Sequence, residues 1–581
     1  MLPFPTLTQT LTFSCQHHKK CAPSTDLMLP IRNGIHSLIM RLFVFSVLLF
    51  NTFDAYKILV YNSKYAHSHS NFLGNIADVL VDAGHNVTSL IPIIDKDVHD
   101  AKEKSSKIYI QASEETQKVM NLLNSKKDNF FKLNTFNPLL TLRMRIEFAQ
   151  QFAFQCKAVL DEVQLLERLK NEHYDVVIVE NFDMCSVGYA HLLQPKSLIT
   201  TSAAIPFSWM YHEFGMPLSL SFNPSSYISS MNGSFWNRVK NIYAEWLMHL
   251  FFYPGRWMVE DVFRERYGPS FPSLQEISSH AAYTLFNTEP LIDFAVPTLN
   301  RIVNIGGIGA KDPAPIGKEW DQLLSRCSQN ILLSFGSVAK SIYLPVDVKE
   351  SIVNTIARFP DVTFIWKYEN PDDDFAKEST AALPNLHLSK WMPQNDLLAD
   401  KRITAFITHG GMGSTQETAI RGKPGIFIPI FADQPRNAGM MEYNGVGKVL
   451  GKFDLINPDI FEAAIRDVLT NDSYRKNAER VSAMLAKKPF TSREQLIKTV
   501  EFAAEYGPSP ALRPQSYDMN IIQYHNLDII GAVIAIAAVF IMISMKTITL
   551  LLSFCAFKFA FTTIYYMARE YGCQNEENED E

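Results

Sequence analysis

A glycine-rich turn that contains one histidine carries the clearest chemical pattern in the sequence. His409, Gly410 and Gly411 follow the apolar segment Ala405–Thr408, which is typical of a buried strand. A strand that ends in such a turn and opens a helix presents free backbone N–H groups and the positive end of a helix dipole, and both bind phosphate. Gly411 leaves room for the ligand, and His409 adds a side-chain donor. The turn therefore predicts a phosphate-binding site.

A second histidine stands where a general base is useful. His69 lies in the run Ser68–Phe72, after the apolar segment Lys57–Tyr61 and at the expected start of a helix. Open α/β sheets bind ligands at the carboxyl ends of their strands, and the positive end of a helix disfavours an additional proton on the ring. A neutral imidazole there can accept a proton from a hydroxyl. His67 lies two residues away and is the rival candidate.

Two acidic residues are candidates for the partner of this histidine. A base histidine needs a carboxylate that fixes its tautomer and stabilises its charged form. The strand-like segment Tyr174–Val179 is followed at once by Glu180, and Asp183 comes three residues later. Glu180 is the preferred candidate because it lies directly at the end of the strand. Asp183 remains the alternative.

Several polar residues around the glycine-rich turn have both a structural and a binding interpretation. The structural ones are a core aromatic for Trp391, a capping box for Ser414 and Glu417, and ordinary turn chemistry before a proline for Asp433 and Gln434. All five lie in one dense block with the turn. That clustering favours the binding interpretation.

Alternating strand and helix patterns must position these residues. Strands are predicted in two groups, at 57–61, 86–91, 174–179 and 197–201, and at 330–334, 362–366, 405–408 and 425–429. Between the first two strands, the apolar residues of 72–81 fall on one helical face, with Ser70 as the N-cap and Gly84 just after the end. A strand, a helix and a strand in close succession indicate a parallel sheet. The predicted fold class is α/β, with two doubly wound Rossmann-like domains facing a cleft.

The chain divides into segments of different composition. The segment 297–329 is rich in glycine and proline and is expected to link the two domains. The expected organisation is a non-structural extension (1–39), a signal peptide (40–55), a first domain (56–296), the linker (297–329), a second domain (330–507), a juxtamembrane segment (508–528), a transmembrane helix (529–550) and a cytosolic tail (551–581).

Apolar segments at both ends predict secretion and membrane anchoring. Arg41 precedes the apolar run Leu42–Phe50, in the order of a secretory signal, although this run lies far from Met1. Ile529–Met545 is uncharged, and a membrane span needs about 20 apolar residues. Basic residues after it favour a cytosolic tail, so we expect a single-pass type I protein of the endoplasmic reticulum with a lumenal body. The start methionine and the choice between one span and two stay open.

Charge and cysteine content exclude some classes of function. A net charge of −6 argues against a general nucleic-acid binder. The cysteines show no spacing typical of a metal site, so no metal is expected. The expected body holds Cys156, Cys185 and Cys327, so at least one thiol stays unpaired in an oxidising compartment. Asn232 and Asn471 are the predicted glycosylation sites.

The segment 391–437, together with the Ser-His-x-Asn-Phe pattern at 68–72, resembles the UDP-glycosyltransferases. This resemblance implies a GT-B fold, a donor bound by the second domain, an acceptor bound by the first, and inversion at the anomeric carbon. It implies His69 as the base and Glu180 as its partner. The implied donor-binding residues are Ser337, Trp391, Gln394, His409, Gly411, Gly413, Ser414, Glu417, Asp433 and Gln434. Many members of this family have Asn where this chain has Gly413, so a side-chain contact to the phosphates is missing here or is replaced by the backbone.

The resemblance also implies the reaction. A glucosyl or glucuronosyl group would pass from a UDP-sugar to a hydroxyl of a small lipophilic acceptor, with the UDP-sugar as co-substrate and no cofactor. Uracil and ribose would lie against Trp391, Gln394 and Glu417, and the sugar against Asp433 and Gln434. The sugar, the acceptor and a homo-oligomeric state stay open. The alternatives are a hydrolase of the same fold and a non-catalytic lumenal binding protein.

Overall fold

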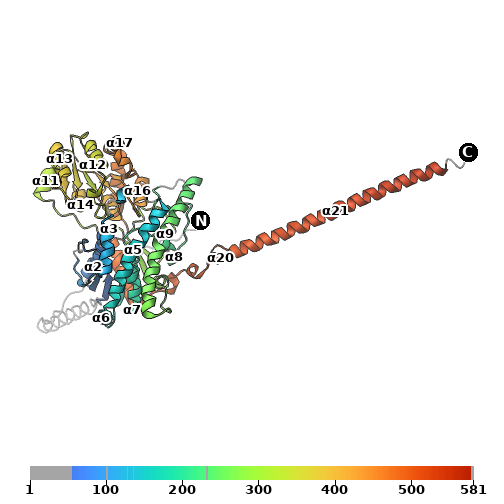
Figure 1. The fold of residues 1–581 in the computed structure, drawn as a ribbon, viewed down its shortest axis with the longest axis horizontal. Coiled ribbons are helices and arrows are strands. Elements are labelled where there is room, and N and C mark those ends of the chain that lie inside the picture. Colours follow the sequence, from blue (N-terminus) through green and yellow to red (C-terminus); the bar gives the residue numbers. More distant parts are fainter. Residues whose placement is uncertain (1–54, 100–102, 127–128, 135, 230–232, 577–581) are drawn as a thin grey trace, which may run out of the picture. The chain divides into compact units, whose positions relative to one another are not determined.

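Two parallel sheets form the body of the protein (Figure 1). The computed structural model describes residues 55–99, 103–126, 129–134, 136–229 and 233–576. The first sheet has seven strands in the order β3-β2-β1-β4-β5-β6-β7. Its strands are β1 (Lys57–Tyr61), β2 (Asn86–Pro92), β3 (Ser106–Ile110), β4 (Val176–Glu180), β5 (Ser197–Ser202), β6 (Tyr283–Phe286) and β7 (Ile302–Asn304).

Helices connect most of the strands of the first sheet, and two of these helices, α5 (Pro138–Asp161) and α9 (Phe235–Tyr267), pack against each other. Met184–Leu193 (α7) follows β4, and α8 and α9 intervene between β5 and β6. The helices of this region are α2 (His67–Asp82), α3 (Glu114–Asn124), α4 (Asn129–Lys132), α5 (Pro138–Asp161), α6 (Val163–Lys170), α7 (Met184–Leu193), α8 (Ser208–Phe214), α9 (Phe235–Tyr267) and α10 (Leu274–Ser279).

The second sheet has six parallel strands in the order β10-β9-β8-β11-β12-β13. They are β8 (Gln329–Ser334), β9 (Val362–Lys367), β10 (Leu386–Ser389), β11 (Ile403–Thr408), β12 (Gly425–Phe427) and β13 (Gly447–Val449). Their helices are α11 (Lys318–Leu324), α12 (Val346–Ile356), α13 (Asp374–Ala382), α14 (Gln394–Ala399), α15 (Met412–Arg421), α16 (Gln434–Tyr443), α17 (Pro458–Thr470) and α18 (Asp472–Ala486).

Both sheets are doubly wound, as predicted. Each has a point where the strand order reverses, between β1 and β4 in the first sheet and between β8 and β11 in the second. Ligands of such sheets bind at the carboxyl ends of the strands that flank this point. The central strands have continuous apolar sequences because helices cover both faces of a parallel sheet. Ile58, Leu59 and Val60 of β1 are accordingly all fully buried.

The boundaries of the domains differ from those expected. The segment 297–329, predicted as a linker, contains β7 of the first sheet and α11, whose Leu323 and Leu324 pack in the second domain. The expected second domain ended at 507, but α19 (Ser492–Tyr506) packs Leu496 and Val500 into the core of the first sheet. The polypeptide therefore crosses between the domains twice, because the apolar face of α19 matches the first sheet.

The start of α2 also differs from the prediction. The helix begins at His67 with Ala66 as the N-cap, whereas Ser70 was expected there. Ser70 lies inside the first turn, and its carbonyl oxygen accepts a hydrogen bond from the Asn62 side chain. Gly84 has φ +94° and follows the helix end, as expected of a residue in the left-handed region. The predicted extension 1–39 and nearly all of the predicted signal peptide 40–55 lie outside the described residues.

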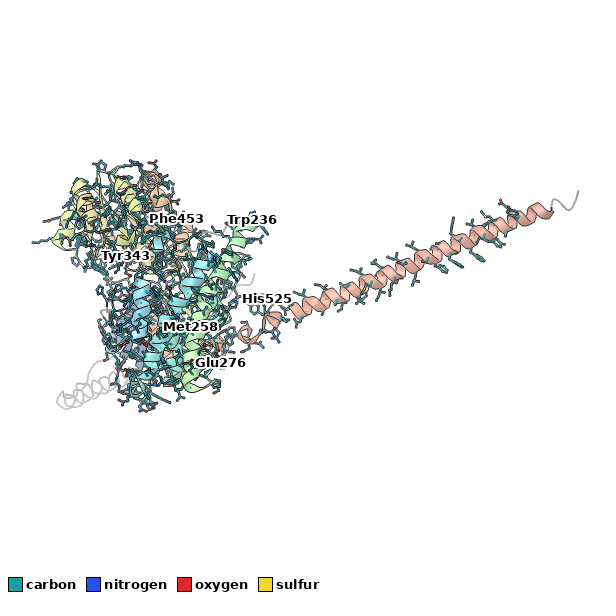
Figure 2. All side chains as sticks on the ribbon, in the orientation of Figure 1. Trp236, Met258, Glu276, Tyr343, Phe453 and His525 are labelled. Carbon is teal, nitrogen blue, oxygen red and sulfur yellow. A yellow bond between two sulfur atoms is a disulfide. The ribbon has the colours of Figure 1, made fainter. Side chains whose placement is uncertain are left out.

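The chain ends in one long apolar helix, α21 (Leu527–Glu576), reached through η3 (Pro510–Leu512), η4 (Gln515–Asp518) and α20 (Ile521–Tyr524). The most apolar window of Leu527–Tyr571 has a mean hydropathy of 2.6, and none of that window is buried. Side chains project from all sides of α21 (Figure 2). The helix is long and apolar enough to cross a membrane, and it continues past residue 550, where the span was expected to end.

One disulfide joins two helices of the first domain. Cys156 on α5 is bonded to Cys185 on α7. Cys327 is a free thiol. This agrees with the expectation that an odd number of cysteines in the body leaves one unpaired.

Candidate active site

The histidine predicted as a base touches the carboxylate predicted as its partner. His69 is the third residue of α2, and its Nδ1 contacts Oε1 of Glu180, the last residue of β4. The Glu180 side chain is 2% exposed, and the same oxygen accepts a hydrogen bond of 3.1 Å from the backbone N–H of Ala203. His69 follows β1 in the chain and Glu180 ends β4, and these two strands flank the point where the order of the first sheet reverses.

Tyr65 completes this cluster and was not found from the sequence. Its hydroxyl lies 2.6 Å from Nδ1 of His69 and donates a 3.2 Å hydrogen bond to Oε2 of Glu180. Burial, followed by the charge of Glu180, raises the pKa of the Tyr65 hydroxyl well above its usual value. The hydroxyl is therefore a neutral donor at working pH. The only signal in the sequence is a tyrosine four residues before His69 in a polar loop.

The rival carboxylate, Asp183, is engaged elsewhere. It caps α7 by accepting a hydrogen bond of 3.1 Å from the N–H of Cys185, and it also accepts one from the hydroxyl of Ser63. Burial raises its pKa to about 6, against the effect of these hydrogen bonds. Asp183 thus holds the start of α7, and Glu180 is the carboxylate against His69.

The rival histidine, His67, faces the second domain. Its ring centroid lies 6.0 Å from that of Trp391, and its Nε2 lies 3.0 Å from Nδ2 of Asn71. Trp391 itself is 59% exposed, so the interpretation of this tryptophan as a core residue is wrong. More than half of its surface is therefore accessible in the region where the two domains meet.

The glycine-rich turn packs tightly around His409. The turn joins β11 to α15, and the imidazole lies between Gly411 and Gly336. A Cβ on Gly411 would lie 2.6 Å from Nε2 of the histidine. Burial, and then the positive charge of Lys367, lowers the pKa of His409 to about 4. The ring is therefore neutral at physiological pH and can donate one hydrogen bond. Ser337 follows β8, the strand next to β11, in the same sheet.

Lys367 is a second site residue that the sequence did not reveal. It ends β9, and its ammonium donates a hydrogen bond of 2.6 Å to the carbonyl oxygen of Gly336. The same group lies 5.2 Å from the centre of the Trp391 ring. Burial lowers its pKa from the usual value. A lysine at the end of a buried strand could have been noticed as the exception in an otherwise apolar run.

The capping box weighed as the structural alternative for Ser414 and Glu417 is absent from the described helix α15. The helix begins at Met412 with Gly411 as the N-cap, so neither residue is in a capping position. Instead, the amide of Gln394 lies 2.5 Å from Oε2 of Glu417 and 3.3 Å from the hydroxyl of Ser414. Burial raises the pKa of Glu417. These three predicted residues are brought together by α14 and α15.

Asp433 lies near His69 although the two belong to different domains. It accepts a hydrogen bond of 2.8 Å from Asn437, and burial raises its pKa while the neighbouring His69 acts in the opposite direction. Gln434 has a local role as well, because its Oε1 accepts hydrogen bonds of 2.8 and 3.2 Å from the N–H groups of Ile430 and Phe431. Its oxygen is thus occupied by the turn before α16.

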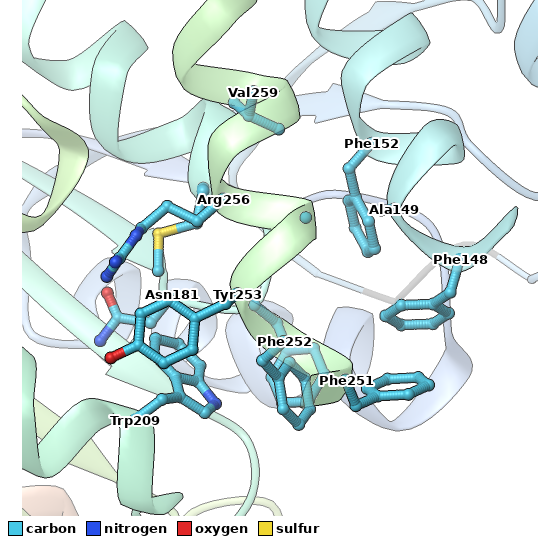
Figure 3. Close-up of a pocket in the computed structure, with 13 residues that line it drawn as sticks. Phe148, Ala149, Phe152, Asn181, Trp209, Phe251, Phe252, Tyr253, Arg256 and Val259 are labelled. Atoms are coloured by element: carbon cyan, nitrogen blue, oxygen red, sulfur yellow. The ribbon is translucent and has the colours of Figure 1, made fainter. Parts of the chain in front are cut away.

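The first domain contains an aromatic pocket next to His69 (Figure 3). Phe182, which lines it, lies 5.0 Å from the His69 ring, centroid to centroid. The lining residues come mainly from α5, α9 and the loop after β4. They are Phe148, Ala149, Phe152, Asn181, Phe182, Met184, Trp209, Phe251, Phe252, Tyr253, Gly255, Arg256 and Val259.

Only one of the two predicted glycosylation sites lies within the described residues. Asn471 is exposed and is the N-cap of α18, where its side chain accepts a hydrogen bond from the N–H of Ser473. Asn232 lies outside the described residues.

Comparison with known proteins identifies the family of this chain. The family described as UDP-glucoronosyl and UDP-glucosyl transferase matches residues 56–560. The chain belongs to the UDP-glycosyltransferase family. It is 30% identical over 493 residues to ugt-47 of Caenorhabditis elegans, named as a UDP-glucuronosyltransferase, with 84% of this chain and 91% of that protein covered. It is 28% identical to UDP-glucuronosyltransferase 1-2 of Rattus norvegicus, with 84% and 90% covered.

The fold of this UDP-glycosyltransferase also matches solved structures. Os79 from O. sativa, in complex with U2F and trichothecene, superimposes with a TM-score of 0.55 at 17% identity, covering 78% of this chain and all of that one. The calicheamicin glycosyltransferase CalG4 superimposes with a TM-score of 0.51 at 14% identity. These similarities confirm the predicted GT-B architecture. The fold and the family establish a glycosyltransferase that uses a UDP-sugar donor.

Proposed function

We propose that this UDP-glycosyltransferase transfers a glucosyl or glucuronosyl group to a hydroxyl of a small lipophilic acceptor, with His69 as the general base. The contact between His69 and Glu180 at the reversal point of the first sheet carries this proposal. Because Nδ1 faces the carboxylate, Nε2 is the nitrogen left to accept a proton.

The proposed reaction is a single displacement with inversion. The acceptor O–H gives its proton to Nε2 of His69 as the oxygen forms a bond to the anomeric carbon of the donor. The bond between that carbon and the diphosphate oxygen breaks, and its electron pair stays on the diphosphate. The neutral His409, the N–H groups of Gly410 and Gly411 and the hydroxyl of Ser337 would stabilise this charge by hydrogen bonds. Glu180 would stabilise the imidazolium.

The second domain supplies a matching set of contacts for the donor. The exposed face of Trp391 suits stacking on uracil. Glu417 and Gln394 would bind the ribose hydroxyls, and Asp433 those of the sugar. The amide NH2 of Gln434 could donate to the sugar as well, because only its oxygen is taken by the backbone. At Gly413 a Cβ would meet no described atom within 4 Å, so a backbone contact or the ligand itself would fill that space.

We further propose a single-pass type I protein of the endoplasmic reticulum, with α21 in the membrane and the body in the lumen. The disulfide between Cys156 and Cys185 supports a lumenal body, because such bonds persist in oxidising compartments. Lys546, Lys558 and Arg569 follow the uncharged part of α21, which agrees with a cytosolic C-terminal end.

A donor panel with matched variants tests the proposed chemistry. Membranes that contain the full chain would receive UDP-glucose or UDP-glucuronate with 2-naphthol, and the glycoside and any free sugar would be quantified. We expect glycoside from the wild type and a loss of at least about 100-fold in kcat for His69→Ala, because a general base contributes that much. His280→Ala, on an exposed histidine outside the site, serves as the control.

Each outcome of this experiment separates the alternatives. Free sugar in place of glycoside would indicate a hydrolase. Binding of 2-naphthol without turnover of either donor would indicate a lumenal binding protein. Equal activity of His69→Ala and His280→Ala would refute the role of His69.

A further inference from the structure

The aromatic pocket beside His69 has one polar end (Figure 3). Asn181, Trp209 and Arg256 lie on one side of the pocket, and the rings of Phe148 and Phe251 lie on the other. Phe182 connects this pocket to the His69 ring. An acceptor whose hydroxyl reaches His69 would therefore extend its remaining atoms into this space.

The polar end contains hydrogen-bonding groups that no described residue satisfies. Asn181 is 1% exposed, yet both its Oδ1 and its Nδ2 lack a partner among the residues of known placement. Trp209 is 6% exposed, and its indole N–H also lacks a partner among the described residues. Buried polar groups are almost always paired, and unpaired ones cost free energy that a bound ligand can recover.

The backbone fixes the position of these groups. Asn181 follows Glu180 at the end of β4, and its N–H donates a 2.9 Å hydrogen bond to the carbonyl oxygen of Thr201. Trp209 lies in the first turn of α8. Asn181, which carries the unpaired amide, is therefore the residue next to the carboxylate that contacts His69, and its backbone is held by a hydrogen bond to β5.

The set of groups matches one kind of ligand. The unpaired groups in the lining of this pocket are two donors, Nδ2 of Asn181 and Nε1 of Trp209, and one acceptor, Oδ1 of Asn181. A hydroxyl accepts from such donors and donates to such an acceptor. An ammonium group would lack the lone pairs that these donors need, and Arg256 would repel it.

We propose that the pocket selects aromatic acceptors that carry a second hydroxyl, remote from the glycosylated one, which binds to Asn181 and Trp209. This inference rests on the proposed function, because it assumes that the pocket receives the acceptor. It names Asn181 and Trp209 as specificity residues for the transfer reaction. A site built to bind a hydroxyl discriminates strongly against the analogue that lacks it.

Two acceptors that differ by one hydroxyl test the proposal. Membranes with the full chain would receive 2,6-dihydroxynaphthalene or 2-naphthol, with whichever UDP-sugar supports transfer, and kcat/KM would be measured for each. We expect the wild type to prefer the diol by about tenfold or more. In Asn181→Leu the preference should fall to about twofold, which is the statistical advantage of two equivalent hydroxyls. Trp209→Phe, which removes the N–H together with part of the indole ring, should lower the preference in part.

Phe251→Leu is the matched control, because it alters the apolar side of the same pocket. It should lower kcat/KM for both acceptors alike and leave their ratio unchanged. Equal use of both acceptors by the wild type, or an unchanged preference in active Asn181→Leu, would overturn the inference while leaving the transfer reaction intact. Absence of transfer to either acceptor by the wild type would instead refute the proposed function.

Discussion

A Cβ added to Gly336 would lie 2.6 Å from Cε1 of the His409 imidazole, so the glycine leaves the space that the histidine occupies. The two residues follow neighbouring strands, β8 and β11, at the reversal point of the second sheet. Gly336 also has φ +86°, where a side chain is strained. The position of His409 therefore depends on the absence of a side chain at residue 336.

Gly336→Ala should displace the imidazole and lower kcat. The loss of one well-placed donor to a developing negative charge costs about 100-fold in kcat. Steady-state kinetics with both substrates would measure it. Gly317→Ala is the control, because Gly317 has φ −67° and no described atom lies within 4 Å of its added Cβ. Normal kcat in Gly336→Ala would show that His409 does not act on the leaving group.

Tyr65→Phe should reduce turnover less than His69→Ala does. The hydroxyl touches both His69 and Glu180 and so positions the pair without reacting itself. Loss of a hydrogen bond of about 1 kcal/mol corresponds to a decrease of about fivefold in kcat, with KM for both substrates unchanged. Tyr443→Phe, on a tyrosine that is 77% exposed, is the control. A change confined to KM would contradict a positioning role.

Acidification should destabilise the protein in part through His409. Its pKa is lowered to about 4 in the folded state, so the unfolded chain binds a proton more readily below its ordinary pKa. The neutral His409 contributes to the free energy of unfolding, and this contribution is fully present above the ordinary pKa of histidine. It is lost as the pH falls towards 4, and the loss between pH 7.5 and pH 5 is about 2 kcal/mol. Urea midpoints in detergent for wild type and His409→Gln would show it. The two proteins should lose stability by different amounts, the variant less; parallel losses would contradict the buried neutral ring.

Removal of the disulfide should destabilise the first domain. The bond joins Cys156 and Cys185, which are 29 residues apart, and constraint of a loop of this size is worth about 3.6 kcal/mol. The double variant Cys156→Ala/Cys185→Ala should have a lower thermal midpoint, measured by ligand-free unfolding in detergent. Cys327→Ala removes a free thiol and should have little effect. Equal midpoints for the two variants would mean that the bond does not form in the cell.

Much of the site was predictable because strand ends determine where side chains gather. Parallel strands place their carboxyl ends at one edge, so Glu180 after β4 and His69 after β1 were expected to meet. The same reasoning favoured Glu180, which lies directly at the strand end, but it left Asp183 open as the alternative. Asp183 is excluded by two contacts: a hydrogen bond from the hydroxyl of Ser63, which comes from a distant segment, and the local cap that Asp183 forms on α7.

Other features depended on tertiary packing that local patterns do not encode. Ser414 and Glu417 have capping-box spacing, but α15 starts earlier, and Glu417 meets Gln394 from a different helix. The apolar face of α19 predicted a helix and not the sheet that it covers. Lys367 and Tyr65 acquire their roles only from neighbours brought together by the fold.

The return of α19 to the first sheet has a mechanical consequence. The chain that leads to α21 leaves from the first domain, and η4 rests on it, with Ser516 donating a 2.7 Å hydrogen bond to the carbonyl oxygen of Gly215. Under the proposed function, α21 would therefore hold the acceptor-binding domain close to the bilayer surface, where lipophilic molecules accumulate. The donor-binding domain, which has no such attachment of its own, would be the more mobile of the two.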